Sequence, residues 1–110
     1  MNVTNPTSAQ DVLVVLTTSP ALQEPVVDWL LEHLDGGGFT GVPVAGHSSR
    51  LEGLSAAEQV SGRQQRYQFQ VQMPVERAEG FLTGLREAFA GADIRYWIMP
   101  VLAGGSLRRD

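Results

Sequence analysis

A strict alternation of apolar and polar residues runs through the middle of the chain, between positions 67 and 73. Tyr67, Phe69, Val71 and Met73 alternate there with Gln68, Gln70 and Gln72. A period of two is typical of a strand with one buried and one polar face. The segment 12–16, VLVVL, is instead apolar at every position, which predicts a short central strand that is buried on both faces.

Two further strands are predicted at the edges of a sheet. The segment 39–47 reads FTGVPVAGH and the segment 94–102 reads IRYWIMPVL. Each contains a proline, Pro43 in the first and Pro100 in the second, and proline has no N–H to donate to a strand ladder. Both segments are therefore expected at a sheet edge, where one side of the strand has no neighbour; the alternative for the segment 39–47 is a bulge at Pro43.

Apolar residues at helical spacing predict two helices. Their apolar stripes are Leu22, Val26, Leu30, Leu31 and Leu34 in the first, and Ala78, Phe81, Leu82, Leu85 and Phe89 in the second. Ser19 and Pro20 form a cap and first-turn pair for the first helix, and Pro74 opens the second. Pro25 either begins the first helix proper or kinks it. Glycines at 36–38 end the first helix.

The elements follow one another in the order β-α-β-β-α-β, which is the ferredoxin-like pattern. In this pattern the first and third strands are central and the second and fourth lie at the edges, where proline is tolerated. We therefore expect an α+β, ferredoxin-like sandwich formed by one domain at residues 11–103. Residues 1–10 and 104–110 are expected to be tails, the first of them flexible.

The two helices of a ferredoxin-like sheet cover one face and leave the other bare. Here the bare face is predicted to be partly apolar, because the segment 12–16 is apolar on both sides and residues 96–101, YWIMPV, bring large apolar groups to both faces of the last strand. Exposed patches of this kind in a small protein usually mark association. We expect a homo-oligomer; the alternative is that residues 103–110 or the N-terminal tail fold over the face.

The connection 47–66 is too long for a hairpin turn, and excursions of this length are usually functional when they are not disordered. Ser55 and Glu58 form a capping box, which predicts a short helix that ends at Gly62. Residues 63–66, RQQR, then lie just beyond this helix, at the base of the loop. Their guanidinium groups can hold a carboxylate or a phosphate, or can interact with the free carbonyl groups of the helix end.

Composition excludes several kinds of chemistry. The 110-residue chain has no cysteine and a net charge of −4, and all eight of its basic residues are arginine. Without cysteine there are no disulfides or thiolate zinc sites, and without lysine there is no Schiff-base chemistry. The negative charge argues against nucleic-acid binding. No apolar run is long enough to span a bilayer and no export segment is seen, so we expect a cytoplasmic protein without membrane insertion.

Motifs for catalysis or metal binding are weak. The segment 47–49, HSS, lacks the nucleophile elbow of hydrolases, and the glycines at 36–38 lack the dinucleotide-binding spacing. A metal site built from His47 with Glu52 or Glu58 is one alternative, although a lone histidine is more often structural. We expect no enzymatic activity and no cofactor.

Three stretches, VDWLLEH, AEQVSGRQQRYQFQV and YWIMPVL, resemble the PII-like superfamily, which includes the CutA divalent-ion tolerance proteins. More narrowly, they are similar to an uncharacterised family of short PII-like proteins whose genes often sit beside heavy-metal efflux pumps of the resistance-nodulation-division type. The resemblance covers about residues 11–103. It implies a homotrimer whose sheets face the three-fold axis, with small ligands in the clefts between subunits, and a membrane efflux protein as a candidate partner.

The chain also departs from these relatives. Nucleotide-binding PII proteins hold phosphates with lysines and a glycine-rich turn, whereas this chain has no lysine and only AGAD at 90–93, so that ATP binding in the usual manner is not expected. Some CutA-like proteins carry cysteine or clustered histidine, and this chain has neither. Copper binding is therefore not supported by the sequence.

We expect, from these observations and the resemblance, a non-enzymatic signalling or regulatory protein that binds a small anionic ligand or a partner protein through the loop and the inter-subunit cleft. The candidate binding residues are His47, Arg50, Glu58, Gln59, Gly62, Arg63, Gln65 and Arg66. The alternative function is divalent metal binding linked to heavy-metal efflux or tolerance.

Overall fold

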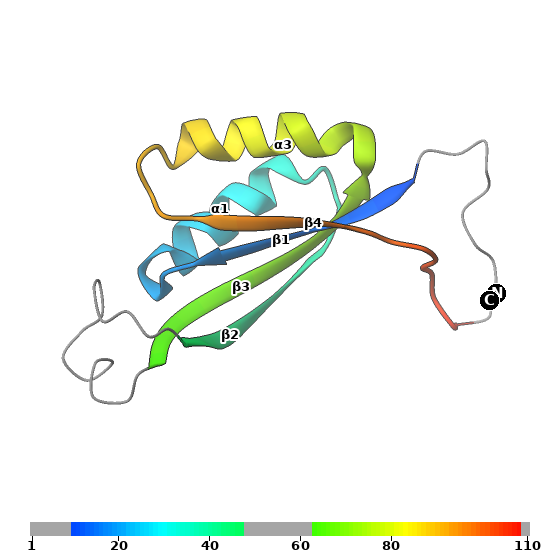
Figure 1. The fold of residues 1–110 in the computed structure, drawn as a ribbon. Helices are drawn as coiled ribbons and strands as arrows, with labels where there is room; N and C mark the ends of the chain where they lie inside the picture. The colour runs from blue at the N-terminus through cyan, green and yellow to red at the C-terminus, as the bar shows by residue number, and fades with distance from the viewer. Residues whose placement is uncertain (1–9, 48–62, 109–110) are drawn as a thin grey trace.

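The computed structural model describes residues 10–47 and 63–108, which form a four-stranded antiparallel sheet with two helices on one of its faces (Figure 1). In chain order the elements are β1 Asp11–Thr18, the 3-10 helix η1 Pro20–Leu22, α1 Gln23–His33, β2 Phe39–His47, β3 Arg63–Pro74, α3 Val75–Ala88 and β4 Arg95–Pro100. The strand order is β2-β3-β1-β4. This order confirms the ferredoxin-like prediction, with β1 and β3 in the centre.

Both edge strands carry a proline, and the proline of the central strand β3, Pro74, is its last residue. Pro43 lies in β2, which pairs with β3, and Pro100 ends β4, which pairs with β1. An edge strand has one side without a ladder partner, so proline is accommodated there without the loss of a hydrogen bond. β4 is shorter than the predicted segment 94–102, whereas β3 begins at Arg63, ahead of the alternating residues.

The first helical segment consists of two parts. The 3-10 helix η1 comes first, and its N-cap position is occupied by Ser19 without a side-chain capping hydrogen bond. The α-helix proper begins at Gln23, so Pro25 lies in its first turn. The N–H groups of the first turn have no partner within the helix, so proline is tolerated at this position.

The apolar stripes of both helices face the sheet, with one exception. The buried members are Val26, Leu30 and Leu34 in and after α1, and Ala78, Leu82 and Leu85 in α3. Leu31 is 68% exposed, because it follows Leu30 by one residue and therefore lies about 100° around the helix. The prediction that Leu31 belongs to the buried stripe is wrong for this reason.

The hydrophobic core lies between the sheet and the two helices. Its fully or almost fully buried members are Val14 and Leu16 of β1, Phe69 and Val71 of β3, and Val26 and Leu30 of α1. Phe69 also packs against the ring of Phe39 in the neighbouring strand, with ring centroids 6.1 Å apart. The alternation in β3 thus orients its apolar side toward the helices, as predicted.

No described helix covers the opposite face of the sheet, which we call the bare face. Cross-strand pairing places on it Leu13, Val15 and Thr17 of β1, Gln68, Gln70 and Gln72 of β3, and Trp97 and Met99 of β4. Trp97 is 65% exposed and Met99 is 45% exposed. The described C-terminal segment reaches this face beside Gln72, whose side-chain nitrogen would lie 3.5 Å from a Cβ atom at Gly104. Residues 1–9 and 109–110, which could also cover the face, lie outside the described residues.

Candidate functional site

A hollow of about 300 Å³ lies at the end of the sheet where the connection between β2 and β3 departs and returns, and we call it the loop-base hollow. It is lined by Pro20, Gln23, Pro43, Val44, Gln65, Arg66 and Tyr67. The pairing of β2 with β3 sets Pro43 opposite Tyr67 and Val44 opposite Arg66. One part of the lining therefore comes from the strand pair, and the other from the start of the first helical segment.

Arg66 is the charged residue of the loop-base hollow. It is half-buried, and among the described residues the structure records no hydrogen bond or ion pair for its guanidinium group. A guanidinium stays charged in proteins, and removing a charge from water is unfavourable unless the charge is paired. An anion that enters the hollow would stabilise Arg66, and its carboxylate or phosphate could accept two parallel hydrogen bonds.

The structure describes four of the eight predicted binding residues and brings them to one end of the sheet. His47 pairs with Arg63 across the β2–β3 ladder, and Gln65 and Arg66 line the loop-base hollow. Arg50, Glu58, Gln59 and Gly62 lie outside the described residues, as do Ser55 and its capping box.

Residues 63–66 belong to β3, because the pairing with β2 extends to the His47–Arg63 pair. The short helix expected ahead of them lies outside the described residues. Positions 63 and 66 are an odd number of residues apart, and such positions fall on opposite faces of a strand. Of these two positions, only 66 is therefore on the bare face.

A second arginine at this end, Arg95, is a residue that sequence reasoning missed. Arg95 pairs with Thr17, and Thr17 pairs with Gln68 of β3, so by alternation Arg95 and Arg66 share the bare face. Two strand spacings, about 10 Å, separate them across the sheet. The signal that could have identified it is the spacing of two between Arg95 and Trp97, which places both side chains on the same face of the predicted strand.

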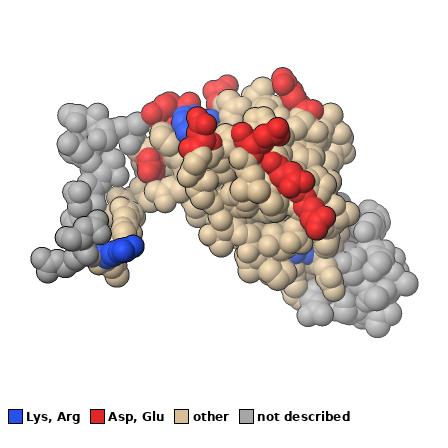
Figure 2. Space-filling view, turned by 180° about the vertical axis from the view of Figure 1, so that it is seen from behind, with Lys and Arg blue, Asp and Glu red and all other residues tan. Residues whose placement is uncertain are grey.

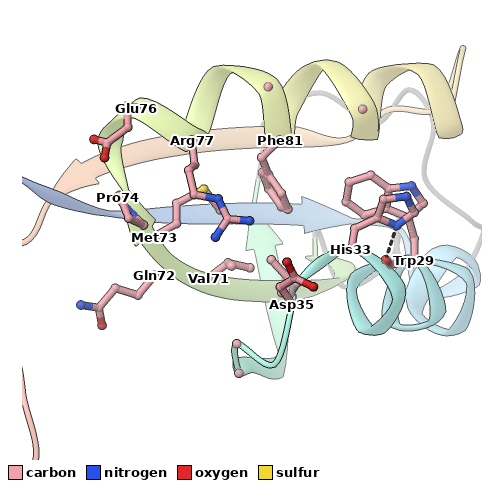
Figure 3. Close-up of a pocket in the computed structure, with 15 residues that line it drawn as sticks. Trp29, His33, Asp35, Val71, Gln72, Met73, Pro74, Glu76, Arg77 and Phe81 are labelled. Carbon is pink, nitrogen blue, oxygen red and sulfur yellow. Dashed lines mark hydrogen bonds between the residues drawn. The ribbon is translucent and has the colours of Figure 1, made fainter. Parts of the chain in front are cut away.

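A larger hollow of about 410 Å³ lies between α1 and α3, and we call it the helix pocket (Figure 3). Its walls and floor include Trp29, His33, Asp35, Val71, Met73, Arg77 and Phe81. None of them was among the predicted site residues. Two sequence spacings indicate this site, because Trp29 and His33, like Arg77 and Phe81, are four residues apart and share one face of a helix.

Acidic side chains are spread over the helical side of the molecule, with few basic groups among them (Figure 2). Within residues 10–47 and 63–108, no group of three or more histidine, aspartate or glutamate side chains could hold a metal ion. Of the residues considered for a metal site, Glu52 and Glu58 lie outside this part of the chain. No helix in the described part of the chain has the length and apolar character needed to cross a membrane.

Comparison with solved structures defines the class of fold. CutA from Synechococcus elongatus is 16% identical, with a TM-score of 0.64, and the match covers 86% of this chain and 80% of that one. PII from Arabidopsis thaliana bound to citrate is 16% identical, with a TM-score of 0.63 and coverages of 89% and 83%. CPII, a nitrogen regulatory PII-like protein from Thiomonas intermedia bound to ADP, AMP and bicarbonate, is 18% identical, with a TM-score of 0.61 and coverages of 91% and 98%. The chain therefore has the fold of the PII and CutA proteins.

The family is narrower than this class. The family described as "Protein of unknown function (DUF3240)" matches residues 8–108, and the chain belongs to it. A DUF3240 family protein of known structure from Shewanella baltica is 25% identical, with a TM-score of 0.73, and the match covers 92% of this chain and all of that one. No curated protein matches the chain.

Proposed function

We propose that this protein is a cytoplasmic, non-enzymatic PII-like regulator or sensor that binds a small anionic ligand, or a carboxylate of a partner protein, at the loop-base hollow. The observation that carries the proposal is Arg66, a half-buried residue that lines the hollow and whose guanidinium group has no recorded partner among the described residues. The other residues proposed to take part are His47, Arg50, Glu58, Gln59, Gly62, Arg63 and Gln65.

The ligands of two neighbours support an anion. The Arabidopsis thaliana PII structure contains citrate, and the Thiomonas intermedia CPII structure contains ADP, AMP and bicarbonate. This chain has no lysine, so only guanidinium groups can supply long positively charged donors at the site. A guanidinium suits planar carboxylate and phosphate groups because its N–H groups form a rigid fork.

The proposal includes a homotrimer in which the bare faces of the sheets meet. Support comes from the exposure of Trp97 and Met99 on this face and of Tyr96 and Ile98 on the other side of the same edge strand. Contiguous exposed apolar surface of this kind is uncommon on a soluble monomer and usually marks an interface.

Titration calorimetry with citrate, AMP, ADP and bicarbonate tests the site. For whichever of these compounds binds the wild type, Arg66→Gln is expected to lower the affinity by about tenfold or more. A hydrogen bond to a charged group contributes about 1.5–3 kcal/mol. The affinity of Arg66→Lys is expected to lie between those of the wild type and Arg66→Gln, because lysine keeps the positive charge but loses the planar fork of N–H groups. The matched control is Arg108→Gln, which removes an exposed arginine from the C-terminal segment.

Two results would contradict the loop-base site. Binding that is unchanged in Arg66→Gln would show that the ligand is held elsewhere. A lower melting temperature without ligand in both Arg66 variants would show that this arginine supports the fold and is not kept for an anion.

A second candidate function is divalent metal binding linked to heavy-metal efflux or tolerance, with a membrane efflux protein as partner. The neighbour that favours it is the periplasmic divalent cation tolerance protein CutA from Archaeoglobus fulgidus, which is 12% identical with a TM-score of 0.62. In this chain the donors would be His47 with Glu52 or Glu58, which are ligand types that zinc accepts. Zinc that raises the melting temperature of the wild type but not of His47→Ala would support this function.

A further inference from the structure

The helix pocket has the size and the lining of a small-molecule site. Its volume of about 410 Å³ falls in the range of roughly 300–1,000 Å³ that is usual for ligand pockets, which are mostly apolar with a few polar groups. Val71 and Met73 lie at its base, and side chains of α1 and α3 line its sides (Figure 3). Every residue that lines it belongs to the described part of the chain.

One end of the pocket is aromatic, and its rings contact one another. The rings of Trp29 and His33 stack, with centroids 4.2 Å apart and planes 15° apart, and Phe81 meets Trp29 edge-on with centroids 5.6 Å apart. His33 Nδ1 donates a hydrogen bond to the backbone carbonyl oxygen of Trp29 at 2.8 Å, which holds the imidazole against the indole. A flat apolar group can pack against these ring surfaces.

Two opposite charges lie beside the aromatic end. Arg77 of α3 and Asp35, which follows α1, extend toward one another across the pocket (Figure 3). Within the described part of the chain, the structure records no hydrogen bond or ion pair between these two side chains. A second carboxylate, that of Glu76, also lines the pocket but points away from Asp35 (Figure 3). The space between Arg77 and Asp35 therefore offers one cationic and one anionic group to a molecule that lies there.

Two glycines of α3, Gly80 and Gly84, also line the pocket. A Cβ atom at Gly84 would meet Cζ2 of Trp29 at 3.3 Å, so glycine lets the indole approach the helix closely. A Cβ atom at Gly80 would meet nothing within 4 Å, so the space beside it is open. Glycine is unfavourable inside a helix, and here it leaves room in the pocket.

We propose that the helix pocket binds a small amino acid with a flat side chain. The carboxylate of the ligand is held by Arg77, its ammonium group by Asp35, and its ring packs against Phe81 and Trp29. A ligand that carried only a negative charge would be attracted by Arg77 but repelled by Asp35, and the reverse holds for a simple amine. A zwitterion satisfies both groups, which is why the observations favour this chemistry.

Titration calorimetry with three related compounds tests the charge requirement. L-phenylalanine carries both charges, 3-phenylpropanoate lacks the ammonium group and 2-phenylethylamine lacks the carboxylate. We expect L-phenylalanine to bind at least about tenfold more tightly than either analogue, because each analogue leaves one charged hydrogen bond unmade. Equal binding of L-phenylalanine and one of the analogues would overturn the zwitterion assignment, and no binding of any of the three would overturn the site.

Substitutions in the pocket test its location. Gly80→Leu places a side chain into open space and replaces a helical glycine, so it should abolish binding while the melting temperature is kept or raised. Thr83→Leu is the matched control, since it adds an apolar side chain at an exposed position of the same helix that does not line the pocket. Phenylalanine binding that survives Gly80→Leu would place the ligand elsewhere.

The two charges are tested separately. Arg77→Gln and Asp35→Asn are each expected to weaken phenylalanine binding by about tenfold or more, and Arg77→Gln should leave the affinity for 2-phenylethylamine unchanged or increased. Arg86→Gln, a change of an exposed arginine near the other end of α3 that is not in the lining, should have no effect. Equal losses of phenylalanine affinity in Arg77→Gln and Arg86→Gln would show a general effect of protein charge. That result would overturn the assignment of the ligand carboxylate to Arg77.

Discussion

The two faces of the sheet differ in how completely the chain covers them. On the helix side, Phe69 and Val71 are 0% and 1% exposed, whereas on the bare face Trp97 and Met99 keep 65% and 45% of their surface in solvent. Strand β3 contributes to both, with apolar residues on the side of the helices and glutamines on the bare face. The two helices cover the centre of the sheet on their side, whereas no described helix covers Trp97 and Met99 on the bare face.

The bare face is also more polar than the helix side, and the glutamine side chains of β3 on this face are hydrogen-bonded. The Gln70 amide donates to Gln68 Oε1 at 3.3 Å, and the Gln72 amide donates to Asp11 Oδ2 at 3.0 Å. These amides form a polar row on β3 beside the apolar residues of β1 and β4. A surface that combines ordered amides with exposed apolar groups is typical of a protein interface and not of a core.

The largest effect is expected on the helix side. Phe69→Ala should lower the free energy of unfolding by about 3–5 kcal/mol, because it removes a fully buried ring from the core. Gln70→Ala, at the next residue of the same strand, should lower the free energy of unfolding by only about 0.5–1 kcal/mol, because it removes one hydrogen bond, to Gln68, and no buried ring. Urea denaturation measures both, and similar losses in the two variants would break the contrast between the faces.

A smaller effect is expected on self-association. Trp97→Asp should weaken the oligomer by at least about tenfold, since a carboxylate that is buried without a partner is unfavourable. Leu31→Asp is the matched control, because Leu31 is as exposed as Trp97 but lies on α1. Sedimentation should show a wild-type species of about three times 11.9 kDa; an 11.9 kDa wild type would contradict the proposed assembly.

The smallest effect concerns the polar row. Gln72→Ala removes the hydrogen bond to Asp11 and should destabilise the protein by about 0.5–1 kcal/mol. When Trp97→Asp has already dissociated the oligomer, Gln72→Ala should lower the free energy of unfolding by less, because water can then replace the amide on the uncovered face. Equal losses in the two backgrounds, measured by urea denaturation, would show that the row is not covered in the assembly.

The sequence was sufficient to predict the order of the elements and the place of each strand in the sheet. Pro43 and Pro100 identified the edge strands because a missing N–H is a local property of the chain. The alternation of residues 67–73 identified the two faces of β3 because its period of two matches that of a strand. These features depend on neighbours in the sequence, so they could be read without the fold.

Tertiary structure decided how much each side chain is covered and which side chains meet. Leu31 and Trp97 are both large and apolar, but neither periodicity nor composition revealed that each would keep about two thirds of its surface exposed. Arg66 and Arg95 share a face only because the register across β3, β1 and β4 brings them there.

The helix pocket is the feature that the sequence determined least. Trp29 and Arg77 lie on different helices, and Asp35 lies in the segment that follows α1. Local pattern determines which face each helix turns to the sheet, whereas the space between two helices depends on how closely they pack. The packing of α1 and α3 on the sheet, with glycine at 80 and 84, therefore decided that a pocket exists between them.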